Sequence, residues 1–217
     1  MLQRSSYLHD RFKIVALLIF AVLTVLSCVN VPNQQYFALQ HVPTVIALVL
    51  LGILDGKWPL DRTSFAFTLA ILALHLLGAR YLYSYVPYDH WGREWLGFSI
   101  QDYFGWERNH YDRLVHLLYG ILMGAVLVRW LPQHFLRKPF WSRILALDIV
   151  LSTSAMYELL EALIAMMLAD DWAESFNGQQ GDMWDAHKDM ALAFAGSLAA
   201  VIFTPPFLFK KSDSRKT

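Results

Sequence analysis

The sequence is poor in cysteine and in charge, and each shortage excludes a class of protein. Cys28 is the one cysteine among the 217 residues, so the chain can form neither an internal disulfide nor a cysteine-rich metal site. Charged residues make up 17% of the chain, whereas a soluble domain is about 25% charged. The 18 basic and 18 acidic residues balance, so no basic excess points to nucleic acid as a partner.

Apolar and aromatic residues are abundant instead. The chain is 56% hydrophobic and contains eight Trp, ten Tyr and fourteen Phe residues, and its mean hydropathy is +0.36. In membrane proteins, aromatic side chains gather at the two membrane–water interfaces. This composition predicts a protein whose principal partner is the lipid bilayer.

Hydrophobic runs predict an all-α membrane protein, a bundle of six transmembrane helices. About 20 helical residues cross a hydrocarbon core of about 30 Å, and six runs reach or approach that length, the first being the shortest. We expect residues 1–209 to form a single membrane domain and residues 210–217 to form a short basic tail. The predicted spans are 14–30, 37–54, 63–86, 111–131, 144–168 and 184–203.

The distribution of basic residues predicts the orientation of these spans. Thirteen of the 18 basic residues fall in the two termini and in the connections that follow the second and fourth spans. Because basic residues favour the cytoplasmic side, both termini are expected in the cytoplasm. The aromatic connection 87–110 then lies on the outer side, where it is expected to cover the membrane surface.

Three predicted spans carry pairs of ionisable residues at helical spacing. A charged side chain at the centre of a bilayer costs at least about 2.5 kcal/mol, so such residues need a partner or a polar cavity. Residues three or four apart share one face of a helix. Spans four and six begin on the predicted outer side and span five ends there, so the pairs are expected to meet in one layer. They are Asp112 with His116, Glu158 with Glu161, and Asp185 with Asp189.

The chemistry of this layer suits a divalent metal ion, because such ions take carboxylates and neutral imidazole as ligands. His116 and Glu161 are also the candidate catalytic residues for acid–base chemistry on an amphiphilic molecule of the cell envelope. The expected metal ligands are Glu158, Glu161, His116 and Asp189. The residues expected at the pocket mouth are Asp112, Asp182, Asp185 and Arg80.

Other interpretations of the same residues stay open. Buried carboxylates also suit a proton or cation pathway, which would make the protein a small transporter, or they can fix helix packing in a non-catalytic scaffold. Asp112 and Asp185 lie where acidic residues cap helices. Arg113 and Lys188 are expected to reach lipid head groups, and Arg80 suits either that role or pairing with the glutamates of span five.

Small residues predict close packing around the layer. Gly120 and Gly124 form a Gly-x-x-x-Gly pair on the helical face that carries His116, and such pairs let helices approach closely. This face is therefore expected to point into the bundle. In span six, a comparable surface is expected from Ala191, Ala195, Gly196 and Ala199.

Three motifs resemble those of a known family. The runs YDRLVH at 111–116, YELLE at 157–161 and GDMWD at 181–185, the last continuing to KDM at 188–190, are similar to those of the YjdF-like bacterial inner-membrane proteins. The likeness extends from the first span to the sixth. It implies a multi-pass protein of the bacterial inner membrane and supplies neither an activity nor a cofactor. A looser likeness to the VanZ-like membrane proteins suggests a connection with the cell envelope.

Overall fold

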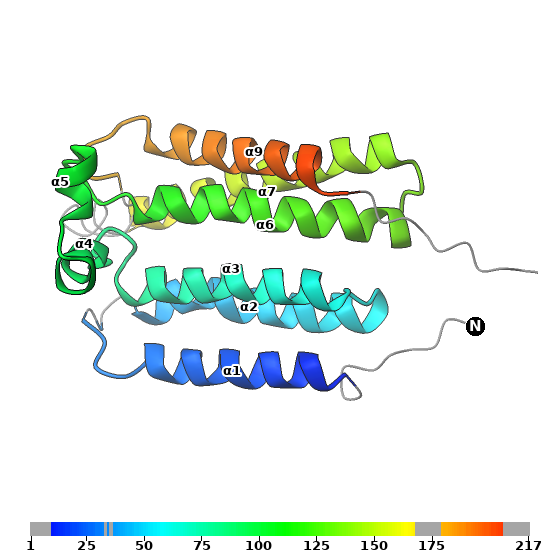
Figure 1. Ribbon diagram of the computed structural model, residues 1–217, viewed down its shortest axis with the longest axis horizontal. Coiled ribbons are helices and arrows are strands. Elements are labelled where there is room, and N and C mark those ends of the chain that lie inside the picture. The colour runs from blue at the N-terminus through cyan, green and yellow to red at the C-terminus, as the bar shows by residue number, and fades with distance from the viewer. Residues whose placement is uncertain (1–9, 33, 35–36, 168–178, 206–217) are drawn as a thin grey trace, which may run out of the picture.

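The computed structural model describes residues 10–32, 34, 37–167 and 179–205, whose regular elements are all helices. Successive long helices run in opposite directions, so α1 begins and α9 ends at the same end of the molecule (Figure 1). We call the opposite end, which carries the short helices, the α4–α5 end. The long helices are α1 (Arg11–Ser27), α2 (Phe37–Lys57), α3 (Arg62–Arg80), α6 (Tyr111–His134), α7 (Pro139–Met167) and α9 (Asp185–Phe203).

Five helices of the described residues, α2, α3, α6, α7 and α9, are long and apolar enough to span a membrane. The all-helical membrane architecture is therefore confirmed with five candidate spans. Helix α1 has 17 residues, the lower limit of about 17–25 residues for a spanning helix. The sixth span, the single membrane domain and the cytoplasmic location of both termini stay predictions, and the tail at 210–217 lies outside the described residues.

The third span was expected to continue to residue 86, but α3 ends at Arg80. Leu82 and Tyr83 follow with φ values of +49° and +53°, a left-handed conformation that ends a helix. The turn folds the Tyr83 ring back over Gly78, where an added Cβ would lie 2.6 Å from the ring. The Tyr83 side chain therefore packs against α3, the helix that precedes it.

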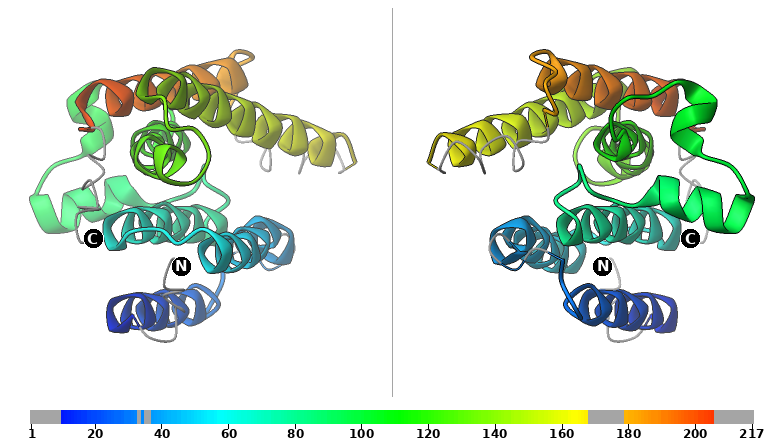
Figure 2. Two further views of the ribbon diagram at one scale, coloured as in Figure 1. Left: turned by 90° about the vertical axis from the view of Figure 1, so that its right-hand side faces the viewer. Right: turned by 90° about the vertical axis from the view of Figure 1, so that its left-hand side faces the viewer.

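The long helices form two groups of three. Helix α3 packs against α1, α2 and α6, while α6 packs against α3, α7 and α9, and the α3–α6 contact joins the groups (Figure 2). Each group has its own apolar core. In the first group the core consists of Phe20, Leu51, Phe65, Leu69, Leu72 and Leu76. In the second it consists of Leu127, Val128, Leu131, Ala146, Val150 and Ala193.

The closest helix contact, between α6 and α9, depends on glycine. A Cβ on Gly120 would lie 2.0 Å from the carbonyl oxygen of Ala193, and a Cβ on Gly196 would lie 2.3 Å from that of Leu117. The expected inward face of α6 is thereby confirmed.

The contact face of α9 differs from the one expected. Ala191 and Ala195 are exposed. Residues three and four apart share one face of a helix, and the buried face of α9 runs through Ala193 and not through these two alanines. That face consists of Ala193, Gly196, Ser197 and Ala200.

The connection between α3 and α6 covers the α4–α5 end. It contains α4 (Tyr88–Trp91), the π-helix η2 (Gly92–Leu96) and α5 (Ile100–Phe104), which lie beyond the ends of the long helices (Figure 1). The side chains of Trp95 and Tyr103 are each 74% exposed. Such a surface suits the predicted contact with the membrane interface.

Candidate functional site

Asp112, His116 and Asp189 form a cluster of potential metal ligands in the described part of the chain. Each offers one ligand atom, and these atoms lie within 4.8 Å of one another. Asp112 and His116 are one turn apart on α6, and Asp189 lies one turn before Ala193, which contacts Gly120. The glycine-dependent crossing of α6 and α9 therefore brings the three side chains together. All three are buried, with exposed fractions of 6%, 6% and 2%.

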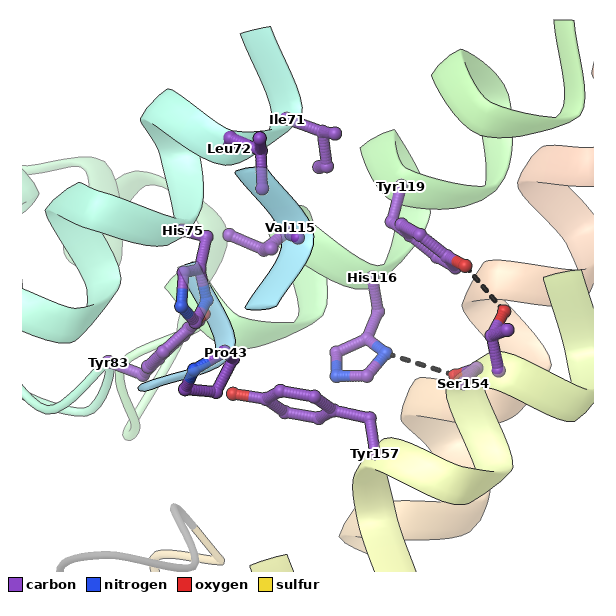
Figure 3. Close-up of a pocket in the computed structure, with 12 residues that line it drawn as sticks. Pro43, Ile71, Leu72, His75, Tyr83, Val115, His116, Tyr119, Ser154 and Tyr157 are labelled. Carbon is purple, nitrogen blue, oxygen red and sulfur yellow. Dashed lines mark hydrogen bonds between the residues drawn. The ribbon is translucent and has the colours of Figure 1, made fainter. Parts of the chain in front are cut away.

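The His116 ring connects this cluster to α7. Its Nδ1 lies 3.3 Å from the Ser154 hydroxyl (Figure 3). Its Nε2 lies 3.1 Å from Oε1 of Glu158 and 3.7 Å from Oδ1 of Asp112. A neutral ring that donates from Nδ1 to Ser154 has a free electron pair on Nε2, which faces the carboxylates. This arrangement is typical of a metal-binding histidine oriented by a hydrogen bond to its other nitrogen.

Oδ1 of Asp189 is buried and makes no hydrogen bond with the described residues. Oε1 of Glu158 is buried as well, and Nε2 of His116, 3.1 Å away, can donate to it only when that nitrogen carries a proton. A buried acceptor without a partner is costly, and a charged one is more so. Protonation, an ordered water molecule or a bound cation would each lower that cost.

Five charged residues form an ion-pair cluster near the beginnings of α6 and α9: Arg108, Arg113, Asp182, Asp185 and Lys188. Arg108 donates two hydrogen bonds to Asp185, at 2.7 and 3.0 Å. Arg113 donates to Asp182 at 2.5 Å and to Asp185 at 3.0 Å. Lys188 donates to Asp182 at 2.6 Å. These bonds connect the segment before α6 and the first turn of α6 with the beginning of α9.

This cluster changes the expected role of two basic residues. Arg113 and Lys188 were expected to reach lipid head groups, but the structure pairs both with Asp182. The hydrogen bond from Lys188 is the main reason that the pKa of Asp182 is lowered to about 2. Arg113 pairs with Asp182 and Asp185, and the described ion pairs of Asp112 and Glu158 are with His116 alone.

Two further predicted site residues lie apart from the three-residue cluster. Glu161 is buried, with 7% exposure, one turn beyond Glu158 on α7. Arg80 was expected at the pocket mouth, but its guanidinium donates to the carbonyls of Ser27 and Val29, both at 2.7 Å. The last carbonyls of a helix have no partner within the helix, so Arg80 satisfies the end of α1.

A cavity of about 220 Å³ lies beside His116 (Figure 3). Its lining comes from α2, α3, α6, α7 and the turn after α3. His75 and Tyr83 form one wall, where the Tyr83 hydroxyl is hydrogen-bonded to Nδ1 of His75. Nε2 of His75 is buried and makes no hydrogen bond of good geometry with the described residues. His116 therefore stands between this cavity and the carboxylates.

Several residues of the site were missed by the sequence analysis. Ser154 could have been found, because it lies one turn before Glu158 on the same face of α7. Arg108 gave no signal, because its partner Asp185 is 77 residues away. Tyr83 could not be predicted either, since its position depends on the left-handed turn after α3.

Comparisons with known proteins agree with the sequence motifs. Residues 12–208 match a family described as "Predicted membrane protein (DUF2238)". The chain is also 30% identical over 194 residues to "Inner membrane protein YjdF" of Escherichia coli strain K12. The aligned region covers 88% of this chain and 87% of that protein. No solved structure matches. The resemblance to YjdF-like proteins and the inner-membrane location are thereby confirmed.

Proposed function

The chain belongs to the DUF2238 family of predicted membrane proteins, and we propose that its buried polar site binds a divalent metal ion. In this proposal the ion is held by Asp112, His116 and Asp189, and it acts on or holds a polar group of an amphiphilic envelope molecule. The observation that carries the proposal is the convergence of three ligand atoms within 4.8 Å in a buried layer. Asp112 replaces Glu161 in the predicted set of ligands, and Glu158 remains a fourth ligand.

The donor set favours a cation of intermediate hardness. One imidazole with several carboxylates suits Zn²⁺ or Mn²⁺ better than the oxygen-only sites of Ca²⁺ or Mg²⁺. In the tetrahedral geometry of Zn²⁺, ligand atoms with bonds of about 2.1 Å lie about 3.4 Å apart, so binding requires these side chains to move closer together by roughly 1 Å. The carboxylates of Glu158, 3.1 Å from Nε2 of His116, and of Asp189, whose Oδ1 makes no hydrogen bond with the described residues, supply negative charge at the same place.

A cation at this position would polarise an oxygen of the bound molecule or activate a water molecule. As a ligand, the His116 ring would be oriented by its hydrogen bond with Ser154. If His116 is not a ligand, it would exchange a proton with the bound molecule. Glu161, buried one turn from Glu158, is the candidate proton acceptor. The adjoining cavity offers room for the group that is acted on.

A proton or cation pathway is the weaker alternative. Such a pathway needs polar groups that continue from the site to the other end of the bundle. In the described residues, the centre of the α6–α7–α9 group is instead filled by Val128, Ala146 and Val150, which are between 0% and 2% exposed.

Metal content tests the proposal. The full chain, purified in detergent without chelator and then exposed to Zn²⁺ or Mn²⁺, should retain one ion per chain after gel filtration, as measured by elemental mass spectrometry. Asp189→Asn should lose that ion, because a neutral amide replaces a charged ligand. Asp102→Asn is the matched control, since the Asp102 side chain is 79% exposed.

Two results would contradict the metal site. One is the absence of bound metal in wild type, and the other is equal metal content in wild type and Asp189→Asn. Either result, with folding unchanged, would leave the carboxylate layer as a packing feature of a non-catalytic scaffold.

A further inference from the structure

The cavity beside His116 is closed on one side and open on the other. Its residues on α3 and on the buried face of α6, among them Leu72 and Val115, are buried. On α2 and α7 the lining is accessible, because Ala47 is half-buried and Thr153 is exposed. Helices α2 and α7 belong to different helix groups and have no extensive contact with each other. The cavity therefore opens between α2 and α7.

Most exposed side chains of α2 and α7 at this depth are apolar, with Ser152 and Thr153 of α7 as exceptions. Val42, Ile46 and Val49 are exposed on α2, and Met156 and Leu160 are exposed on α7. Both helices are candidate membrane spans, so these side chains face lipid. The opening is therefore continuous with the lipid-facing surface of the protein.

The opening also lies below the helix ends. His116 is five residues from the beginning of α6 and Pro43 six residues from that of α2, which places both about 8 Å from the α4–α5 end at 1.5 Å per residue. A molecule that reaches the cavity between α2 and α7 therefore comes from the bilayer and not from water.

The inner wall of the cavity offers a polar group to such a molecule. Nδ1 of His75 is bonded to the Tyr83 hydroxyl, and a neutral ring that accepts at Nδ1 carries its proton on Nε2. That Nε2 is buried and makes no hydrogen bond of good geometry with the described residues, although the Gln40 backbone also interacts with the ring, and His75 is 9% exposed. A ligand oxygen would satisfy this donor.

We propose that the cavity binds a phospholipid of the surrounding bilayer, which enters sideways between α2 and α7. Its acyl chain lies in the opening, and an oxygen of its phosphate or ester group accepts from His75 beside His116. The proposal rests on the proposed function, because the lipid is then the amphiphile that the bound cation meets. The anionic phosphate also complements a cation held by Asp112 and Asp189.

The size of the cavity fits partial entry. Its volume of about 220 Å³ is below the roughly 300–1,000 Å³ of pockets that enclose a drug-sized ligand. A complete phospholipid cannot fit, so most of the molecule stays in the bilayer while one polar group and the adjacent part of a chain enter.

Photo-crosslinking tests the lateral entry. The full chain is reconstituted in vesicles of phosphatidylglycerol, part of which carries a diazirine close to the carbonyl end of one acyl chain, and labelled residues are mapped by mass spectrometry. Label should appear on Leu72, which lines the cavity and is 9% exposed. Label confined to outward residues such as Ile46 and Leu160 would overturn the proposal.

A matched pair of variants tests the opening itself. Ala47→Phe adds a ring at the entrance and should reduce labelling of Leu72 to background. Ile46→Phe adds a similar ring to a neighbouring side chain that is 54% exposed, and it should leave the labelling unchanged. If both variants keep the labelling of Leu72, or if both lose it, the result would contradict entry between α2 and α7.

Competition in the wild-type protein tests the phosphate without any substitution. Unlabelled phosphatidylglycerol should reduce labelling of Leu72 more strongly than the same amount of diacylglycerol, which has the chains without the phosphate. Equal competition by the two lipids would overturn the role of the phosphate.

The lipid and metal proposals fail in different ways. Asp189→Asn should lose the metal but keep the label on Leu72, because the acyl chain does not contact the carboxylates. A wild-type protein that binds metal without labelling Leu72 would refute the lipid site and leave the metal site standing. Labelled Leu72 without bound metal in any preparation would refute the metal site alone.

Discussion

At the residue scale, His116 connects the parts of the candidate site. Its Nε2 faces Glu158 and Asp112, its Nδ1 lies near Ser154, and its ring lines the cavity. If Nε2 binds a metal ion, the hydrogen bond at Nδ1 fixes the tautomer and the orientation of the ring. The Ser154 hydroxyl is then a positioning group for the metal ligand.

Replacing Ser154 with alanine should therefore weaken metal binding without abolishing it. Loss of such a hydrogen-bond partner lowers metal affinity by about 10–100-fold, which competition with a chelator of known affinity can measure for Zn²⁺. Ser152→Ala, the same change at an exposed residue of α7, should leave affinity unchanged. Equal affinity in the two variants would mean that Ser154 does not orient the ring.

Sequence spacing predicted part of this residue-scale picture. The pair Asp112 and His116 and the residue Asp189 were predicted in one layer, because helical periodicity and alternating helix direction determine their depth. The contacts of Arg80 were not predicted, since periodicity cannot indicate that its partners are the carbonyls at the end of α1. The roles of the individual residues in metal binding stay predictions.

At the element scale, the crossing of α6 and α9 positions the ligands. Gly120→Ala should destabilise the protein by about 1–3 kcal/mol, as overpacking of a close contact does, because the new Cβ would lie 2.0 Å from a carbonyl oxygen. Thermal unfolding in detergent measures the change. The shift between α6 and α9 should also reduce metal content, since it separates Asp189 from His116.

Gly52→Ala is the control for this substitution. An added Cβ at Gly52 meets nothing within 4 Å, and alanine favours a helix over glycine by about 0.5–1 kcal/mol. The control should therefore be as stable as wild type or more stable. A Gly120→Ala protein with wild-type stability and metal content would show that the close crossing is not needed.

The ion-pair cluster predicts a pH dependence at the same scale. The pKa of Asp182 is lowered from 3.8 to about 2, chiefly by its hydrogen bond with Lys188. A carboxylate with a lowered pKa stabilises the folded state above its unfolded pKa, and this contribution disappears as pH falls through the folded value. Wild type should therefore be more thermostable than Asp182→Asn at pH 5–7, and the difference should shrink between about pH 4 and pH 2.

The comparison needs a carboxylate outside this cluster. Asp102→Asn, at an exposed position of α5, should show a much smaller difference from wild type over the same range. If Asp182→Asn and wild type have the same melting temperature at every pH, the ion pairs of Asp182 with Lys188 and Arg113 do not stabilise the fold.

At the scale of the whole molecule, the site lies where the two helix groups meet. Asp112, His116 and Asp189 belong to the α6–α7–α9 group, while His75 and Tyr83 extend from the α1–α2–α3 group to the other side of the cavity. The α3–α6 contact joins the groups, but α2 and α7 remain apart (Figure 2). This separation leaves the cavity open on the side that faces lipid.

Hydropathy predicted the helical membrane architecture well, because a spanning helix must be long and apolar. It did not predict the C-terminal end of α3, which depends on the left-handed residues Leu82 and Tyr83. It also gave no sign that Lys13 and Asp55 form a buried ion pair at 2.8 Å, since the two residues meet only through tertiary packing. The cavity likewise arises from the arrangement of four helices and has no local sequence signal.

X-ray absorption spectroscopy of the Zn²⁺-loaded protein tests the metal site most directly. We expect one imidazole nitrogen and two or three oxygens at about 2.0–2.2 Å from the ion, and loss of the imidazole signal in His116→Ala. A bound ion with no imidazole ligand, or an unchanged spectrum in His116→Ala, would contradict the assignment of Asp112, His116 and Asp189 as its ligands.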